Sequence, residues 1–134
     1  MKRIIISGLI AGVASGVIMV LFAISGLYEL FSVPPYWPPV DLQAIAQVEI
    51  ISGIVWGMIW AGLYAFFYDT IPAKGVKKGL TYGLIIWIIS GFRDAVTASA
   101  YGFYLWTTPH AISTFFSICI TYGFLIGYLY KPPK

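Results

Sequence analysis

The chain has 134 residues, of which 60% are hydrophobic and only 10% are charged. This composition excludes a soluble globular domain and predicts an integral membrane protein. The formal net charge of +3 does not indicate a nucleic-acid-binding protein, because the basic residues flank apolar segments. We instead expect these residues to set the orientation in the membrane and to contact membrane lipid.

Four apolar segments are each long enough to cross a membrane, for which about 20 residues suffice. They cover residues 4–27, 42–68, 79–104 and 109–130. The alternation of apolar and polar residues that marks a membrane β-barrel is missing. The sequence therefore predicts an all-α, polytopic membrane protein, a single domain over residues 1–134 built as a bundle of four transmembrane helices. The first segment runs past the length of a cleavable signal peptide, so we expect it to be retained.

The basic residues predict the orientation of the four helices. The segments "YELFSVPPYWPPVD" and "LWTT", which join helices one to two and three to four, contain neither lysine nor arginine. All basic residues but one fall at the N-terminus, in the middle loop or at the C-terminus: Lys2, Arg3, Lys74, Lys77, Lys78, Lys131 and Lys134. By the positive-inside rule both termini are expected to be cytoplasmic.

The prolines of residues 34–39 predict a stiff external cap between the first two helices. Thr108 and Pro109 are predicted to be the N-cap and the first position of the fourth helix.

Aromatic and basic residues near the helix ends are expected at the membrane interface. On the cytoplasmic side the tyrosines are Tyr64, Tyr68, Tyr128 and Tyr130. We expect Lys77 and Lys78 to be interfacial anchors. Three tryptophans lie well inside their helices, where wedges between helices are the favoured interpretation: Trp56, Trp60 and Trp87. The single cysteine, Cys119, is expected to be a small packing residue.

Glycines recur at four-residue spacing in every predicted helix. This spacing leaves a groove that lets another backbone approach closely, and in the first helix it forms a glycine zipper. The positions predicted to pack helices are Gly8, Gly12, Gly16, Gly53, Gly57, Gly79, Gly83, Gly123 and Gly127. Packing within the chain is the favoured interpretation, and a dimer or subunit contact is the alternative.

Ionisable residues from three helices are predicted to meet in the outer half of the membrane. With a rise of 1.5 Å per residue, Arg93 lies roughly 21 Å and Glu49 roughly 28 Å from the cytoplasmic ends of their helices, and His110 reaches about the same level. Because neighbours point about 100° apart on a helix, Arg93 and Asp94 need different partners. We expect Arg93 to pair with Glu49, and Asp94 to share a polar face with Thr97 and His110, a face that also includes Ser90 and Tyr101.

Two interpretations of this cluster remain open. The first is a structural pin that satisfies charges inside the bilayer. The second is an external polar site for a cation, a proton or a small polar ligand, with the tentative members Glu49, Arg93, Asp94, Thr97 and His110. Carboxylate and imidazole groups suit a metal ion, but the Glu-x-x-His pairs of di-iron bundles are missing. We predict neither a metal site nor a cofactor.

Catalytic motifs are missing as well. The sequence has no nucleophile elbow, no glycine-rich loop after a strand and no Cys-x-x-Cys pair, so no catalytic residue is predicted and an enzyme is not expected. The favoured function is a non-catalytic accessory or scaffold subunit that packs in a larger membrane complex or a homo-oligomer. The alternative is a small oligomeric transporter or channel that uses the external polar site.

Two stretches, "GLIAGVASGVIMVLF" and "ISGIVWGMIWAGLYAFFYDTIPAKGVKKGLTYGLIIWII", carry a family resemblance. Their glycine-zippered first helix, G-x-x-x-G second helix and Lys-Gly-Leu-x-Tyr-Gly-Leu start of helix three resemble an uncharacterised group of small four-helix prokaryotic integral membrane proteins. The resemblance implies this architecture and a place in the prokaryotic plasma membrane, but no settled activity. Many members carry a histidine where this chain has Glu49.

A short internal repeat links helices three and four: "LTYGLIIWI" begins at Leu80 and "ITYGFLIGY" at Ile120. The two copies are predicted to run in opposite directions through the membrane, as in transporters with inverted repeats. Nine residues of this composition do not establish a transport cycle.

Overall fold

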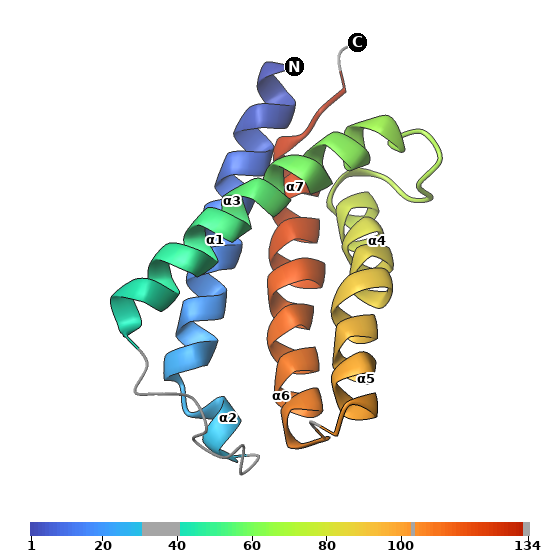
Figure 1. Ribbon diagram of the computed structural model, residues 1–134. Coiled ribbons are helices and arrows are strands. Elements are labelled where there is room, and N and C mark those ends of the chain that lie inside the picture. Colours follow the sequence, from blue (N-terminus) through green and yellow to red (C-terminus); the bar gives the residue numbers. More distant parts are fainter. Residues whose placement is uncertain (31–40, 103, 133–134) are drawn as a thin grey trace.

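The computed structural model describes residues 1–30, 41–102 and 104–132, with the backbone alone for Tyr28, Glu29, Tyr104 and Trp106. All regular structure in this part of the chain is helical (Figure 1). Four helical units are long and apolar enough to cross a membrane: Lys2–Ile24, Leu42–Phe66, Gly75–Ala100 and Thr107–Leu129. The predicted all-α class and the four long apolar helices are thereby confirmed.

The first two units are α1 (Lys2–Ile24) and α3 (Leu42–Phe66), with a single short helix, α2 (Leu27–Leu30), after α1. Gly26 follows α1 with a φ of 72°, a left-handed conformation that glycine adopts without strain. The carboxylate of Asp41 caps α3 by accepting a 2.9 Å hydrogen bond from the backbone N–H of Gln43. The proline-rich cap predicted between these helices lies outside the described residues.

The third and fourth units each contain a π-helical segment. The third runs through α4 (Gly75–Trp87), η1 (Ile88–Phe92) and α5 (Arg93–Ala100). The fourth runs through α6 (Tyr104–Thr114), η2 (Phe115–Tyr122) and α7 (Gly123–Leu129). The expected helix start at Thr108 and Pro109 is wrong, since Pro109 lies inside α6. The third unit likewise begins at Gly75, four residues before the predicted Gly79.

The helices form two antiparallel pairs, α1 with α3 and α4 with α7, which meet where α1 packs against η2 and α7. Figure 1 shows that α3 crosses α1 at a steep angle, so the N-terminal half of α3 diverges from α5 and α6. Both chain ends lie at the same end of the bundle (Figure 1), where the guanidinium of Arg3 donates a 2.7 Å hydrogen bond to the carbonyl of Lys131.

Glycines lie where the backbones of each pair come closest. A Cβ atom built on Gly12 would stand 2.5 Å from the carbonyl oxygen of Gly53, and one on Gly83 would stand 2.6 Å from that of Cys119. Real Cβ atoms do not approach other atoms so closely, so only glycine fits. The same crowding occurs at the remaining predicted packing glycines: Gly8, Gly16, Gly53, Gly57, Gly79, Gly123 and Gly127. These contacts are all within one chain.

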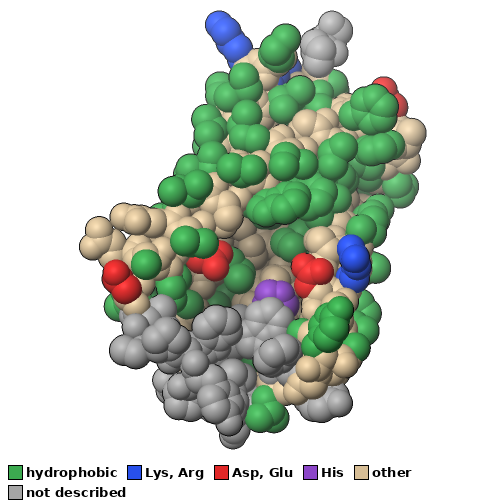
Figure 2. Space-filling view, viewed as in Figure 1, with side chains coloured by type: hydrophobic (Ala, Val, Ile, Leu, Met, Phe, Trp, Pro, Cys, Tyr) green, Lys and Arg blue, Asp and Glu red, His purple; other side chains and the backbone are tan. Residues whose placement is uncertain are grey.

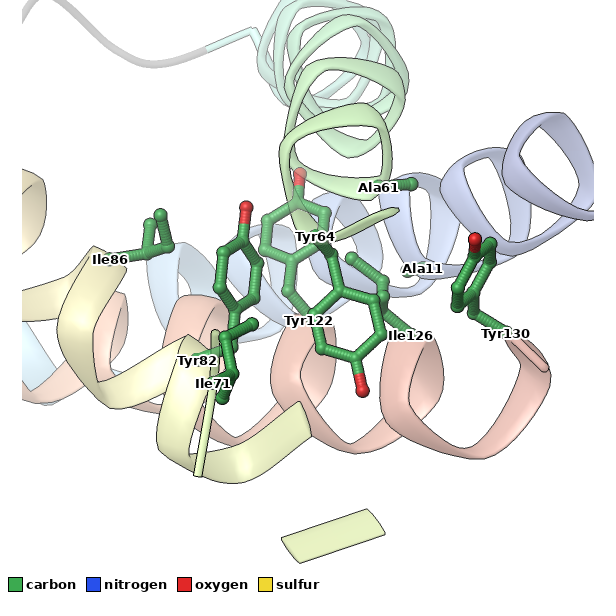
Figure 3. Packing of buried hydrophobic residues seen from close by; sticks show 9 residues of the cluster. All are labelled: Ala11, Ala61, Tyr64, Ile71, Tyr82, Ile86, Tyr122, Ile126 and Tyr130. Atoms are coloured by element: carbon green, nitrogen blue, oxygen red, sulfur yellow. The ribbon is translucent and has the colours of Figure 1, made fainter. Parts of the chain in front are cut away.

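Aromatic side chains fill the core at the end that carries the termini. Tyr64 on α3 is completely buried and packs edge-on against Tyr82 of α4 and Tyr130 after α7, with ring centroids 5.1 and 5.7 Å apart (Figure 3). Tyr64, which was expected at the membrane interface, is therefore part of the core at this end of the bundle. Edge-to-face packing of this kind adds about 0.5–1.5 kcal/mol per pair beyond area burial, so the cluster fastens α3 to the other pair of helices.

Candidate functional site

The predicted ion pair between Arg93 and Glu49 is not formed within the chain. Arg93 is exposed at the start of α5, and Glu49 is partly buried on α3. No N···O distance of 4.0 Å or less joins a basic to an acidic side chain among the described residues. The physical reason is the crossing angle of α3, which moves the half of that helix with Glu49 away from α5 (Figure 1). The helical rise predicted that Arg93 and Glu49 lie at about the same depth in the membrane. It does not predict the lateral distance between their helices.

Asp94 and His110 are near enough to one another for an electrostatic interaction. Asp94 is exposed on α5, and His110 is partly buried on α6. Thr97 lies one turn further along α5 and is exposed. The hydroxyl of Ser90 donates to the carbonyl of Ile86 in its own helix. The structure thus brings Asp94 near His110, with Thr97 one turn from Asp94 on α5, and leaves Glu49 and Arg93 without the predicted ion pair.

The π-helical segment η1 changes the direction of Ser90 relative to Asp94 and Thr97. It ends at Phe92, directly before α5, and Gly91 within it packs against Thr114 of α6. A π-turn closes over five residues instead of four, so it rotates every side chain that follows relative to a continuous α-helix. The predicted stripe assumed α-helical spacing throughout. The spacing from Asp94 to Thr97 lies within α5 and keeps it, whereas Ser90 lies within η1.

The surface is hollowed between α3 and the α5 and α6 pair (Figure 2). Figure 2 shows acidic side chains and the histidine gathered on one face, at the level where the surface is depressed between α3 and the α5 and α6 pair. The depression follows from the divergence of α3. Charged and polar groups therefore face a recess in an otherwise apolar surface.

A second depression is almost entirely apolar. It has a volume of about 400 Å³ and lies between the third and fourth helical units, with Trp87, Phe92, Val96, Ile112 and Phe115 among its lining residues. None of the predicted site residues lines it. In the described part of the chain, no three His, Cys, Asp or Glu side chains come close enough together to hold a metal ion.

Two tyrosine hydroxyls attach α3 to the rest of the bundle, and neither hydrogen bond was predicted from the sequence. Tyr122 of η2 donates a 2.7 Å hydrogen bond to the carbonyl of Gly53, and Tyr82 of α4 donates one of 2.8 Å to the carbonyl of Trp60. Both tyrosines occupy the same place in the Thr-Tyr-Gly copies of the internal repeat. The repeat therefore has a structural counterpart in two equivalent attachments to α3.

Lys78 is buried beneath the tyrosine cluster. Only 8% of its surface is exposed, its ammonium donates a 2.6 Å hydrogen bond to the carbonyl of Tyr68, and Nζ lies 4.0 Å from the centre of the Tyr68 ring. The hydroxyl of Tyr64 in the same cluster is buried and has no hydrogen-bond partner among the described residues. Lys78 thus joins the start of α4 to the end of α3, in contrast to the exposed Lys77.

Comparisons with protein-family models, with curated proteins and with solved structures found no match to this chain. The resemblance to small four-helix prokaryotic membrane proteins therefore stays a prediction. The fold and the placement of the charges carry the functional argument.

Proposed function

We propose that this chain is a non-catalytic integral membrane protein with both termini in the cytoplasm, which acts as an accessory or scaffold subunit by packing against membrane partners or copies of itself. Its place would be the prokaryotic plasma membrane. Insertion is supported by rows of exposed apolar side chains, such as Val17, Val55 and Ile88, on helices long enough to span. Lipid is the medium in which such surfaces are stable.

The observation that carries the proposal is where the charges within the spans lie. Arg93 and Asp94 are exposed on α5, whereas the contacts between paired helices are closed by glycine and tyrosine packing. A charge within a bilayer costs about 2.5–3.5 kcal/mol on insertion scales unless it gains a partner. Surface charges in an apolar belt are therefore expected to meet another protein or a lipid headgroup, which is what a subunit requires.

Native mass determination after gentle solubilisation tests the subunit proposal. The chain should appear with larger subunits or as a defined homo-oligomer, and both assemblies should survive exchange into lipid nanodiscs. A chain that stays monomeric and partner-free at every concentration would contradict it.

Cysteine labelling tests the orientation. In a Cys119→Ser background, Gln43→Cys and Lys74→Cys mark opposite ends of α3 and its following loop, and both positions are exposed. We expect a membrane-impermeant maleimide to label intact cells at position 43 only. Labelling at position 74 from outside would reverse the proposed topology.

A second candidate function is supported by the electrostatic interaction between Asp94 and His110. A carboxylate that acts on an imidazole is suited to bind a cation or to pass a proton, so a small oligomeric transporter is the alternative. Flux assays in proteoliposomes distinguish the two functions. Transport of protons or monovalent cations that Asp94→Asn abolishes, with the oligomer intact, would favour the transporter. A flux no greater than that of empty liposomes would favour the subunit function.

A further inference from the structure

Two opposite charges within the spans form no ion pair with a described residue of their own chain. Glu49 on α3 and Arg93 on α5 have neither a side-chain hydrogen bond nor an ion pair with any described residue. The carboxylates of Glu49 and Asp94 each interact electrostatically within the chain, with Tyr122 and His110 respectively. An arginine and a carboxylate without an ion pair are each costly in hydrocarbon, so the lack of an ion pair at Glu49 and Arg93 requires an explanation.

Glu49 and Arg93 lie at the same level of the bundle. Glu49 is seven residues from the start of α3 at Leu42, and Arg93 is seven residues from the end of α5 at Ala100. At 1.5 Å per residue each lies roughly 10 Å from the end of its helix. The two helix ends belong to the same end of the molecule, opposite the termini (Figure 1). In a second copy with the same orientation in the membrane, Glu49 would therefore lie at the depth of Arg93 in the first copy, and Arg93 at the depth of Glu49.

Charges of both signs flank one face. Figure 2 shows acidic side chains over α3 on one side of the hollowed face, and a basic side chain beside an acidic one over α5 on the other. A two-fold axis along the bundle, in front of this face, places the α5 side of one copy opposite the α3 side of the next. In such an isologous contact each copy supplies both partners, so one interaction occurs twice.

We propose that two copies of this chain associate through this face, with Arg93 of each copy paired to Glu49 of the other. The inference rests on the proposed membrane insertion and self-association and names their interface. Apolar surface is available beside the charges, since Trp56 lies two turns from Glu49 on the same face of α3 and is 50% exposed, and Ile89 is 60% exposed. Trp56 is also stacked on Trp60, and aromatic anchors of this kind carry much of the energy of interfaces.

Cross-linking between two tagged copies tests the contact. One copy carries Glu49→Cys and the other Arg93→Cys, both with Cys119→Ser, and native membranes are oxidised. We expect a product of twice the chain mass that contains both tags. The matched control is Leu21→Cys with Phe116→Cys, which are 51% and 46% exposed in the same half of the molecule but belong to other helices. Cross-linking no stronger than in the control pair would overturn the proposal.

Charge reversal separates a protein partner from a lipid one. Glu49→Arg and Arg93→Glu should each weaken dimerisation in nanodiscs at least about tenfold, because like charges then face each other, and the double variant should restore it. If Arg93 instead binds a lipid phosphate, Arg93→Glu releases that lipid and adding Glu49→Arg restores nothing, which overturns the pairing.

Alkaline carbonate extraction distinguishes failure of the inference from failure of the proposed function. A chain that resists extraction and co-purifies with larger subunits, but gives no cross-link, would contradict the dimer interface alone. A chain released by carbonate would contradict membrane insertion and with it both proposals.

Discussion

The hydroxyl of Tyr122 donates a 2.7 Å hydrogen bond to the carbonyl oxygen of Gly53, across the place where three helices meet. The same carbonyl faces Gly12 of α1, where a Cβ atom would stand 2.5 Å away. One peptide group of α3 is therefore in close contact with α1 on one side and η2 on the other. The two antiparallel pairs of the bundle are joined at this point.

Tyr122→Phe should lower stability without changing the fold. The substitution removes one largely buried hydrogen bond and keeps the ring, so we expect a loss of about 0.5–1.5 kcal/mol, toward the lower end because hydrogen bonds between membrane helices average about 0.6 kcal/mol. Thermal unfolding in detergent measures the change. Tyr128→Phe is the matched control, since Tyr128 is 61% exposed on the next helix. Equal melting of both variants would show that the hydroxyl of Tyr122 is not an attachment.

A pair of glycine substitutions tests the backbone contacts. Gly12→Ala should destabilise by about 1–3 kcal/mol, as overpacking does, because its new Cβ meets the backbone of α3. Gly62→Ala, within α3 itself, has nothing within 4 Å of the new Cβ. It should be neutral or stabilising by up to about 1 kcal/mol, since alanine favours helix more than glycine does. The two changes add the same methyl group, so opposite shifts in melting temperature would be due to the close contact between Gly12 and the backbone of α3. Similar shifts in the two variants would contradict the importance of this contact.

The features that depend on local composition could be predicted from the sequence. The features that depend on the angles between helices could not. Long apolar runs and four-residue glycine spacing anticipated the four helices and the packing positions, because both follow from the 1.5 Å rise and 3.6-residue turn. The Arg93–Glu49 pair failed because it needed the crossing angle of α3. The π-turn of η1 alters only the direction of Ser90 relative to the predicted Asp94 face, and its only local sign is Gly91 inside an apolar helix. The bonds of Tyr82 and Tyr122 to α3 were likewise unforeseen, although the repeated Thr-Tyr-Gly had marked both residues.

Neighbouring lysines at the start of α4 offer a final test of how the end near the termini is built. Both were expected to be interfacial anchors, but Lys78 is buried with its ammonium bonded to the carbonyl of Tyr68, whereas Lys77 is exposed. Lys78→Met keeps most of the side-chain length and removes a charged donor, whose hydrogen bond is worth about 1.5–3 kcal/mol, together with its cation–π contact with Tyr68. Lys77→Met should change stability by no more than about 0.5 kcal/mol. Melting temperatures of the two variants in the same detergent decide the matter. A Lys78 variant as stable as the Lys77 variant would mean that the buried ammonium does not fasten α4 to the end of α3, and that both lysines act only at the membrane surface.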